Sequence, residues 1–292
     1  MKKKLVIFTG AGISKESGIP TFRDEAEGLW NNVPVELVCT PQGLAERPDI
    51  VHEFYNEMRD EMLTKEPNSA HYDCVELEKY FDVTVITQNV DNLHEKAGSS
   101  KVIKIHGDLT KVRATGNSKK VWTHLGHTDP DMKIEGFHIR PHIVFFYEQL
   151  LDWDEAVRAV READLMIIVG TSLQVYPAAD LPNHLSYDNP IYYIDPNPGR
   201  VPELCVGDVV EIRKPATEGM KDVIHKILKF VKDEKYGHLM TLEEFNKAKK
   251  TWLSVTDDGS GYYSDGTMVF DDMEVTESDP DDRCTHVMWY GK

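Results

Sequence analysis

The sequence predicts an α/β protein built on a doubly wound, mostly parallel, Rossmann-like sheet. Three observations support this fold class. Apolar runs rich in β-branched residues alternate with helical patterns, a glycine-rich turn follows the first run, and polar residues follow the later runs. We expect strands at 4–9, 83–87, 102–105, 164–169, 190–194 and 209–212. Insertions at about 38–70 and 110–140 are expected to form a smaller lobe beside the sheet.

The composition limits the class of protein. The chain has 292 residues, enough for one large domain with a small companion or for two domains. Its formal net charge of −17 argues against a nucleic-acid groove, which needs a basic surface. No apolar run approaches the roughly 20 residues that span a bilayer, so no membrane partner is expected. The first apolar run is too short for a signal peptide and the four cysteines form no CxxC pair, which predicts a cytoplasmic chain.

The stretch after the first predicted strand is rich in glycine. Residues 10–23 read Gly-Ala-Gly-Ile-Ser-Lys-Glu-Ser-Gly-Ile-Pro-Thr-Phe-Arg. Glycines let a backbone approach a pyrophosphate, and the N–H groups at the helix start face the anion. The common dinucleotide fingerprint places its third glycine at position 15, whereas here it is Gly18, which disfavours an ordinary dehydrogenase. The alternative is a glycine turn that only joins a strand to a helix.

Two helices are expected between the first two strands. Ile50, Val51, Phe54 and Met58 share one face of a helix that covers 49–58. A second helix is expected to begin near Ser69, which we interpret as its N-cap.

Polar motifs follow the ends of the later strands, where open α/β sheets bind their ligands. Gln88, Asn89 and Asp91 follow the second strand, although Asp91 could also cap the helix after it. An imidazole at the end of a strand is well placed to act as a base, and His106 follows the third strand. The later motifs are Gly170-Thr171-Ser172, Asp195-Pro196-Asn197, and Ala216-Thr217 ahead of a helix at 220–231.

These motifs, in this order, resemble those of the sirtuins, the NAD-dependent protein deacylases, over about residues 3–233. The glycine stretch resembles the opening signature of that family, and 24–30 resembles a cofactor-covering loop that ends in Gly-Leu-Trp. Residues 87–91 resemble its Thr-Gln-Asn-Ile-Asp motif with Val90 in place of Ile, and His106-Gly107 resembles its base motif. Residues 170–179 resemble Gly-Thr-Ser-Leu-x-Val-x-Pro-Ala-Ala.

The resemblance implies NAD as cofactor and assigns roles to individual residues. His106 is implied as the general base, while Asn89 and Gln88 contact the nicotinamide ribose and order a catalytic water. Asp91 is implied at the nicotinamide pocket. The full set of implied cofactor-binding residues is Gly10, Ala11, Gly12, Ile13, Ser14, Ile19, Phe22, Arg23, Trp30, Gln88, Asn89, Asp91, His106, Gly170, Thr171, Ser172, Asp195, Asn197, Ala216 and Thr217.

The same resemblance implies an acyl-lysine peptide as substrate. Residues 139–148 resemble the stretch whose backbone adds a strand to that peptide, and the implied substrate-binding residues are Tyr55, Ile143 and Phe146. Tyr55 could instead be a packed helix tyrosine. Family members that remove acidic acyl groups carry an Arg three residues after this Tyr, but here that position is Met58. Tyr147 replaces a glycine, and this would hinder peptide binding if the position needs a positive φ.

The interval 110–139 lacks the two CxxC pairs that hold a structural zinc in most sirtuins. A site made of histidines alone is an alternative, with His124, His127, His138 and His142 as its candidate ligands. We prefer a loop without metal, packed around Val121, Trp122, Leu125, Met132 and Phe137. No metal site is therefore predicted.

The chain is expected to divide into a catalytic domain at 1–235 and an acidic C-terminal extension at 236–292. The extension carries 12 acidic and 5 basic residues, and the resemblance does not cover it. A capping-box pattern predicts a helix from 241 to 252, and Asp265-Gly266 predicts a hairpin, so the extension is a short α+β segment.

The predicted activity is NAD-dependent removal of an acyl group from lysine, with transfer of that group to ADP-ribose. Two alternatives remain open. One is an NAD hydrolase or ADP-ribosyltransferase on the same scaffold, and the other is a non-catalytic NAD-sensing module. The sequence carries no signal for the acyl group or for the oligomeric state.

Overall fold

The computed structural model describes residues 2–21, 33–116, 119–199, 201 and 209–232, and four short strands between 252 and 288. Of the predicted site residues, Phe22, Arg23 and Trp30 lie outside this part of the chain. Within it, no helix has both the length and the apolar character needed to cross a bilayer.

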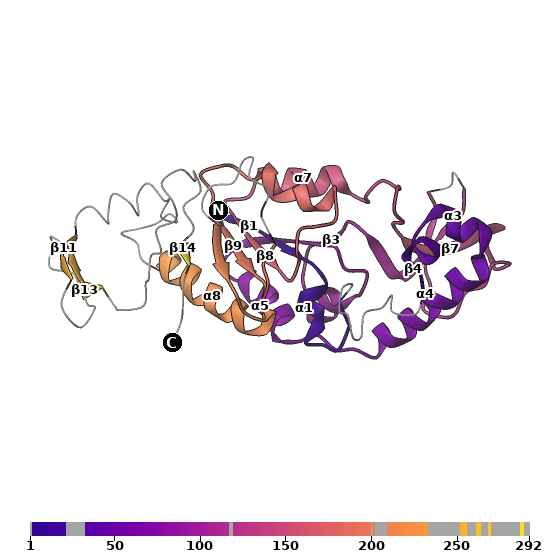
Figure 1. The fold of residues 1–292 in the computed structure, drawn as a ribbon, viewed down its shortest axis with the longest axis horizontal. Helices are drawn as coiled ribbons and strands as arrows, with labels where there is room; N and C mark the ends of the chain where they lie inside the picture. Colours follow the sequence, from indigo (N-terminus) through magenta and orange to yellow (C-terminus); the bar gives the residue numbers. More distant parts are fainter. Residues whose placement is uncertain are drawn as a thin grey trace.

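A seven-stranded parallel sheet forms the centre of the molecule (Figure 1), in the order β14-β10-β9-β8-β1-β2-β3. The strands are β1 (Lys4–Thr9), β2 (Asp82–Thr87), β3 (Val102–Lys104), β8 (Leu165–Val169), β9 (Ile191–Ile194), β10 (Val209–Ile212) and β14 (Val287–Met288). The first six coincide with the predicted runs, so the predicted fold class is confirmed. From β3 to β10 the order is that of a Rossmann sheet, and it reverses direction between β1 and β8. Only β14 was not expected.

Helices cover both faces of the sheet and bury its central strands β8 and β9 completely. α5 (Ser69–Leu77) and α8 (Ala216–Lys232) lie on one face, and α7 (Trp153–Arg161) with the 3₁₀ helix η1 (Ala178–His184) lies on the other (Figure 1). Successive side chains of a strand point to opposite faces. Leu5 and Ile7 therefore pack under α5 and α8, while Val6 and Phe8 pack under α7 and η1. This double burial explains why the strands read as unbroken apolar runs.

The two predicted helices before β2 are present with different bounds. α4 (Pro48–Leu63) extends the predicted 49–58 at both ends. α5 begins at Ser69, but its N-cap is Asn68, whose side-chain oxygen accepts a hydrogen bond from the Ala70 amide. The expected cap at Ser69 is therefore wrong by one residue. α8 likewise begins at Ala216, four residues before the predicted helix.

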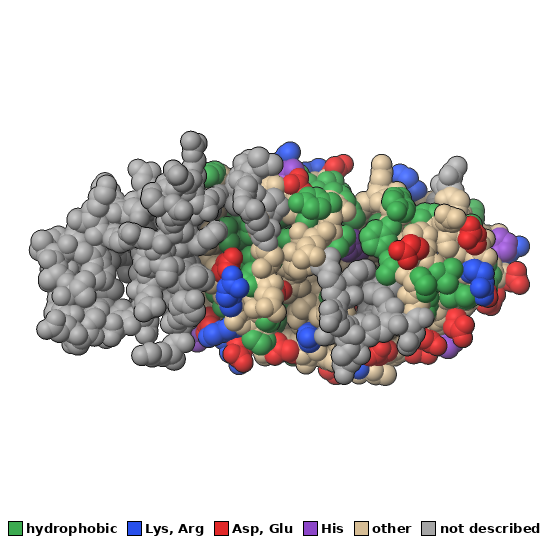
Figure 2. Space-filling view, viewed as in Figure 1, with side chains coloured by type: hydrophobic (Ala, Val, Ile, Leu, Met, Phe, Trp, Pro, Cys, Tyr) green, Lys and Arg blue, Asp and Glu red, His purple; other side chains and the backbone are tan. Residues whose placement is uncertain are grey.

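A smaller lobe lies to the right of the sheet in Figure 1. It contains α2 (Val35–Val38), α3 (Pro41–Glu46), α4 and a four-stranded antiparallel sheet in the order β5-β4-β7-β6. Those strands are β4 (Gly107–Ala114), β5 (Val121–Thr123), β6 (Lys133–Ile134) and β7 (Phe137–Ile143). Figure 2 shows acidic side chains over α4, where Glu53, Glu57 and Asp60 are exposed.

Strands cover 110–114, 121–123, 133–134 and 137–139 of the interval 110–139, and the expectation that it packs around its own apolar side chains is wrong. Val121, Leu125 and Phe137, which were expected inside it, are 42%, 51% and 37% exposed. The core of the lobe lies on the other side of this sheet, where Leu109 of β4, Ile143 of β7 and Phe145 pack against α4. An alternating strand keeps only one of its faces apolar, and the sequence pattern does not tell which face meets α4.

The remaining short elements complete the chain. α1 (Ala11–Lys15) follows β1, and α6 (Leu93–Ala97) follows β2. In the C-terminal segment, β11 (Trp252–Val255), β12 (Gly261–Tyr263) and β13 (Met268–Val269) form an antiparallel sheet. The pairing of β12 with β13 confirms the predicted hairpin, whose turn lies outside the described residues. Trp252 begins a strand rather than ending a helix, and the rest of the predicted helix, 241–251, lies outside the described residues.

Candidate functional site

The predicted site motifs meet at one edge of the parallel sheet. Gly10 follows β1, Gln88 follows β2, His106 follows β3 and Gly170 follows β8. These four strands are neighbours in the order β8-β1-β2-β3, so their carboxyl ends lie side by side. The position includes the reversal in strand order, which is where sheets of this kind bind nucleotides.

The glycines allow the loops after β1 and β8 to touch. A Cβ on Gly12 would lie 2.5 Å from the Gly170 Cα atom, and one on Gly10 would lie 2.7 Å from the Gly170 oxygen. Gly170 itself has a φ of 62°, which favours glycine. The amides of Gly10 and Gly12 donate to the carbonyls of Val169 (3.0 Å) and Gly170 (2.8 Å). These two amides therefore join the loops to each other, in contrast to the expectation that the loop amides face an anion.

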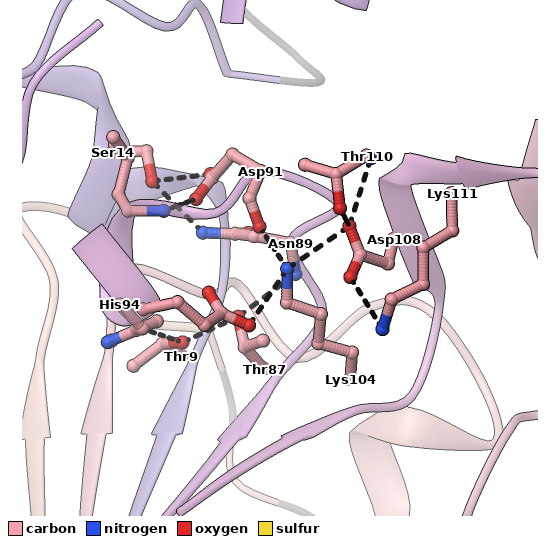
Figure 3. Close-up of polar contacts among 12 residues, drawn as sticks. Thr9, Ser14, Thr87, Asn89, Asp91, His94, Lys104, Asp108, Thr110 and Lys111 are labelled. Atoms are coloured by element: carbon pink, nitrogen blue, oxygen red, sulfur yellow. Dashed lines mark hydrogen bonds and ion pairs between the residues drawn. The ribbon is translucent and has the colours of Figure 1, made fainter. Parts of the chain in front are cut away.

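The polar side chains after β2 bond to the glycine loop (Figure 3). The Asn89 amide nitrogen donates to the Gly10 carbonyl at 3.0 Å and to the Ser14 hydroxyl at 3.2 Å. Ser14 in turn donates to Asp91 Oδ2 at 2.8 Å, while Asp91 Oδ1 accepts from the Leu93 amide at 3.0 Å. Asp91 therefore supports the start of α6 as well as the loop. Burial raises the pKa of its carboxyl group.

His106 has the geometry of a base. Its Nδ1 lies 3.0 Å from the Gln88 carbonyl oxygen, which can only accept a hydrogen bond. Nδ1 therefore carries the proton, and Nε2 holds the lone pair of the neutral ring. Burial lowers the pKa of His106, so the neutral form is favoured at pH 7.

A set of buried polar residues supports the site and was not found from the sequence. The Thr9 hydroxyl donates to Thr87 Oγ1 at 2.8 Å and lies 3.1 Å from His94 Nε2 (Figure 3). Thr87 Oγ1 also accepts from the Asn89 amide at 3.0 Å, which fixes the start of the motif after β2. Thr9 and Thr87 are the last residues of neighbouring strands, and this polar ending was the available signal.

The motifs that follow β8 and β9 also lie close to the end of β2. Gln88 Nε2 donates to Thr171 Oγ1 at 2.8 Å, linking the ends of β2 and β8. The Thr171 carbonyl accepts from the Tyr193 hydroxyl at 2.6 Å. Asp195 is held in its own loop, accepting from the Asn197 amide at 2.8 Å, and burial raises its pKa.

The first helix also reaches the start of α8. The Glu16 carboxylate accepts hydrogen bonds from the Thr217 amide at 3.0 Å and from its hydroxyl at 2.7 Å. This contact joins residues 201 positions apart, and it places Thr217 beside the end of α1.

The residues predicted to bind substrate have different environments. Tyr55 is 2% exposed and stacks on Phe145, with a distance of 6.1 Å between ring centroids. Ile143 is also buried, whereas Phe146 is 39% exposed and its amide donates to the Cys39 carbonyl at 2.9 Å. Tyr55 is therefore packed inside the smaller lobe, in agreement with the alternative interpretation of a packed helix tyrosine.

Tyr147 occupies a strained backbone position. It has a φ of 72° and its side chain is 96% exposed. The positive φ that would explain a glycine here is therefore present, and the tyrosine ring points into solvent. Glu148 closes this turn by accepting from the Phe145 amide at 2.9 Å and pairing with Arg113 and Arg140.

The histidines of the smaller lobe have separate partners. His127 Nε2 lies 2.6 Å from Asp60 Oδ2, and His138 Nδ1 lies 3.2 Å from the Pro130 oxygen. Burial lowers the pKa of His142 to about 4. Among the described residues, no three side chains of His, Cys, Asp or Glu are grouped as metal ligands.

Comparison with known proteins identifies relatives of this chain. The model of the Sir2 family matches residues 10–177. The NAD-dependent protein deacylase of Bacteroides thetaiotaomicron is 45% identical over 228 residues, which is 76% of this chain and 96% of the relative. The NAD-dependent protein deacylase of Helicobacter pylori strain J99 is 43% identical over 239 residues, covering 80% of this chain and 98% of the relative.

Solved structures agree with these relatives. A Sir2 homologue in complex with NAD has a TM-score of 0.68 and 37% identity, covering 78% of this chain and 90% of the other. Sir2Tm bound to a propionylated peptide has a TM-score of 0.62 and 29% identity, covering 77% of this chain and 93% of the other. The sequence match spans more than half of the chain and the fold agrees along most of it, so this chain belongs to the Sir2 family, the sirtuins.

Proposed function

We propose that this chain is an NAD-dependent protein-lysine deacylase that transfers the acyl group to ADP-ribose and releases nicotinamide. One observation carries the proposal above the others: Asn89 and Asp91 bond to the glycine loop at the same sheet edge as the neutral base His106. The relatives named as NAD-dependent protein deacylases match this chain over nearly their whole length.

The residues at this edge suit a dinucleotide. Gly10, Gly12 and Gly170 let the loops after β1 and β8 pack backbone to backbone, because any Cβ on them would collide with the facing loop. NAD supplies a ribose carbon that becomes electrophilic as nicotinamide leaves. We propose that the glycine loop holds the phosphates, that Asp91 lies at the nicotinamide end, and that 170–172, Asp195 and 216–217 hold the adenosine end. Ile13 and Ile19 flank the loop, and Phe22, Arg23 and Trp30 complete the proposed cofactor set.

His106 and the two amide side chains divide the work of catalysis in this proposal. The His106 Nε2 lone pair removes a proton from a ribose hydroxyl, since Nδ1 is engaged by the Gln88 carbonyl. The Asn89 amide nitrogen donates to Gly10 and Ser14, so its amide oxygen points away from the glycine loop. In this proposal that oxygen accepts a hydrogen bond from the catalytic water. General-base assistance of this kind is worth roughly 10²–10⁴-fold in rate.

The peptide half of the site is proposed to lie along residues 143–148. Phe146 offers an exposed ring, and Ile143 with Phe145 forms the apolar wall behind it, supported by the stacked Tyr55 ring. The exposed Tyr147 at a φ of 72° favours a second candidate, NAD cleavage without a peptide, because its ring stands in the segment proposed for docking.

We propose that 1–235 is the catalytic domain and that 236–292 is an acidic extension. A cytoplasmic location is supported by Cys39 and Cys74, which are buried as free thiols.

One incubation tests the activity. The protein is mixed with NAD and an acetyl-lysine peptide, and the sugar product is identified by mass spectrometry. O-acetyl-ADP-ribose with deacetylated peptide is the expected result. Free ADP-ribose with intact peptide would support NAD hydrolysis instead, and no consumption of NAD would exclude both activities. His106→Ala is expected to lose at least 100-fold in rate; full activity of this variant would remove His106 as the base.

A further inference from the structure

Lys104 is the last residue of β3 and lies two positions before His106. Its side chain is only 10% exposed, and its ammonium group meets three different segments (Figure 3). Nζ donates to the Asp91 carbonyl oxygen at 2.6 Å and lies 3.0 Å from Glu95 Oε1 and 3.5 Å from Asp108 Oδ1. A buried lysine is costly unless it is paired, so three partners around one ammonium indicate a fixed position.

Two of the three partners of Lys104, Asp91 and Asp108, are anchored in turn. Asp91 belongs to the loop after β2, and its carboxylate is held by Ser14 of the glycine loop. Asp108 stands two residues after His106 and accepts from the Thr110 amide at 3.0 Å. Lys104 therefore connects the loop that carries Asp91 with the segment that carries His106. The register of β2 with β3 ends at Thr87 and Lys104, before either functional residue. Beyond it, one backbone bond joins the same two segments, from the Leu109 amide to the Val90 carbonyl at 2.9 Å, and Lys104 adds a charged side-chain link to it.

We propose that Lys104 is a positioning residue that fixes the Asp91 loop at the nicotinamide end of the cofactor site. The proposal rests on the proposed function, in which Asp91 lies at that end. Its physical basis is the charge-assisted hydrogen bond to the Asp91 carbonyl, which is a stronger restraint than a neutral one. Without the ammonium, the carbonyl loses this donor and Glu95 loses its ion pair, while Asp108 keeps Lys111 at 3.1 Å.

The proposal predicts a selective loss of affinity. NAD carries nicotinamide and ADP-ribose does not, so a disturbed Asp91 loop weakens NAD binding and leaves ADP-ribose binding unchanged. We expect Lys104→Met to raise the dissociation constant for NAD by about tenfold, the loss that matches one positioned charge-assisted hydrogen bond. The dissociation constant for ADP-ribose is expected to stay within about twofold. Inhibition by nicotinamide should weaken in parallel with NAD binding.

Lys96 offers a matched control. Its ammonium also donates to backbone carbonyls, at 2.6 Å to Lys65 and 3.2 Å to Leu63, but these lie at the end of α4 and just after it. Its side chain is 23% exposed. Lys96→Met removes the same kind of interaction away from the Asp91 loop, and we expect it to leave both dissociation constants unchanged.

The experiment is titration calorimetry of the full chain with NAD and, separately, with ADP-ribose. The proposal is overturned if Lys104→Met binds NAD as tightly as Lys96→Met does, or if it loses affinity for NAD and ADP-ribose equally. If Lys104→Met fails to fold, Asp108→Asn replaces it. That variant removes one ion-pair partner of the ammonium, and it should raise the dissociation constant for NAD about threefold without changing that for ADP-ribose. Equal NAD affinity of the wild type and Asp108→Asn would refute the proposal. Failure of the wild type to bind or consume NAD would instead refute the proposed function.

Discussion

Replacing Tyr147 by glycine should stabilise this protein. A residue with a Cβ at a φ of 72° costs about 1–2 kcal/mol relative to an unstrained conformation. The substitution removes that cost and loses almost no buried area, because the ring is 96% exposed. Glycine gives the unfolded chain more freedom, which costs about 0.4–1 kcal/mol. The expected net gain in the free energy of unfolding therefore lies between about 0 and 1.6 kcal/mol and is centred near about 0.8 kcal/mol.

Tyr187→Gly provides the comparison. Tyr187 is also mostly exposed, at 70%, and lies in a turn, but it is not at a positive φ. Only the cost in the unfolded chain applies there, so this variant should be destabilised by about 0.4–1 kcal/mol. Together the two variants should differ by about 1–2 kcal/mol.

Equilibrium unfolding in urea measures both variants under identical conditions. The midpoint of Tyr147→Gly should rise and that of Tyr187→Gly should fall, with unchanged slopes. If both variants lose stability by similar amounts, the backbone at Tyr147 is not strained and the reasoning fails. A second readout is the KM for an acetyl-lysine peptide, which should fall in Tyr147→Gly if the ring obstructs docking.

Three further outcomes can be checked. Gly12→Ala places a Cβ 2.5 Å from the Gly170 Cα atom, so it should lose at least tenfold in NAD affinity by calorimetry and about 1–3 kcal/mol in stability; wild-type binding would contradict the contact. Burial lowers the pKa of His106, so the imidazole stays neutral at pH values below its ordinary pKa of 6.5. The acid limb of the pH profile of kcat/KM should therefore lie below pH 6.5, and a limb above pH 6.5 would contradict this. Arg59→Met leaves the Leu109 and Gly126 carbonyls without their donor, so the free energy of unfolding should fall by about 1–3 kcal/mol in urea, and an unchanged midpoint would exclude that role.

Arg59 shows what a helical sequence pattern predicts about a side chain and what it does not. The sequence places Arg59 one residue, or roughly 100°, away from the position that an acid-specific deacylase would use. That angle correctly separates it from Met58. The angle does not reveal that Arg59 is fully buried, with its guanidinium bonded to Leu109 and Asn56. Those partners depend on how α4 meets β4, which no local pattern contains.

The sequence by itself determined the six-stranded parallel core and the edge at which the site lies. Each strand is a local apolar run, and parallel strands bring their carboxyl ends to one edge, so the motifs after β1, β2, β3 and β8 had to meet. Only the tertiary structure decided the contact of Gly12 with Gly170, the strained position of Tyr147 and the link from Lys104 to Asp91. The first and third of these join groups on different loops, and the second is a backbone angle. All three depend on packing distances of a few ångströms, which residue types and their spacing do not encode.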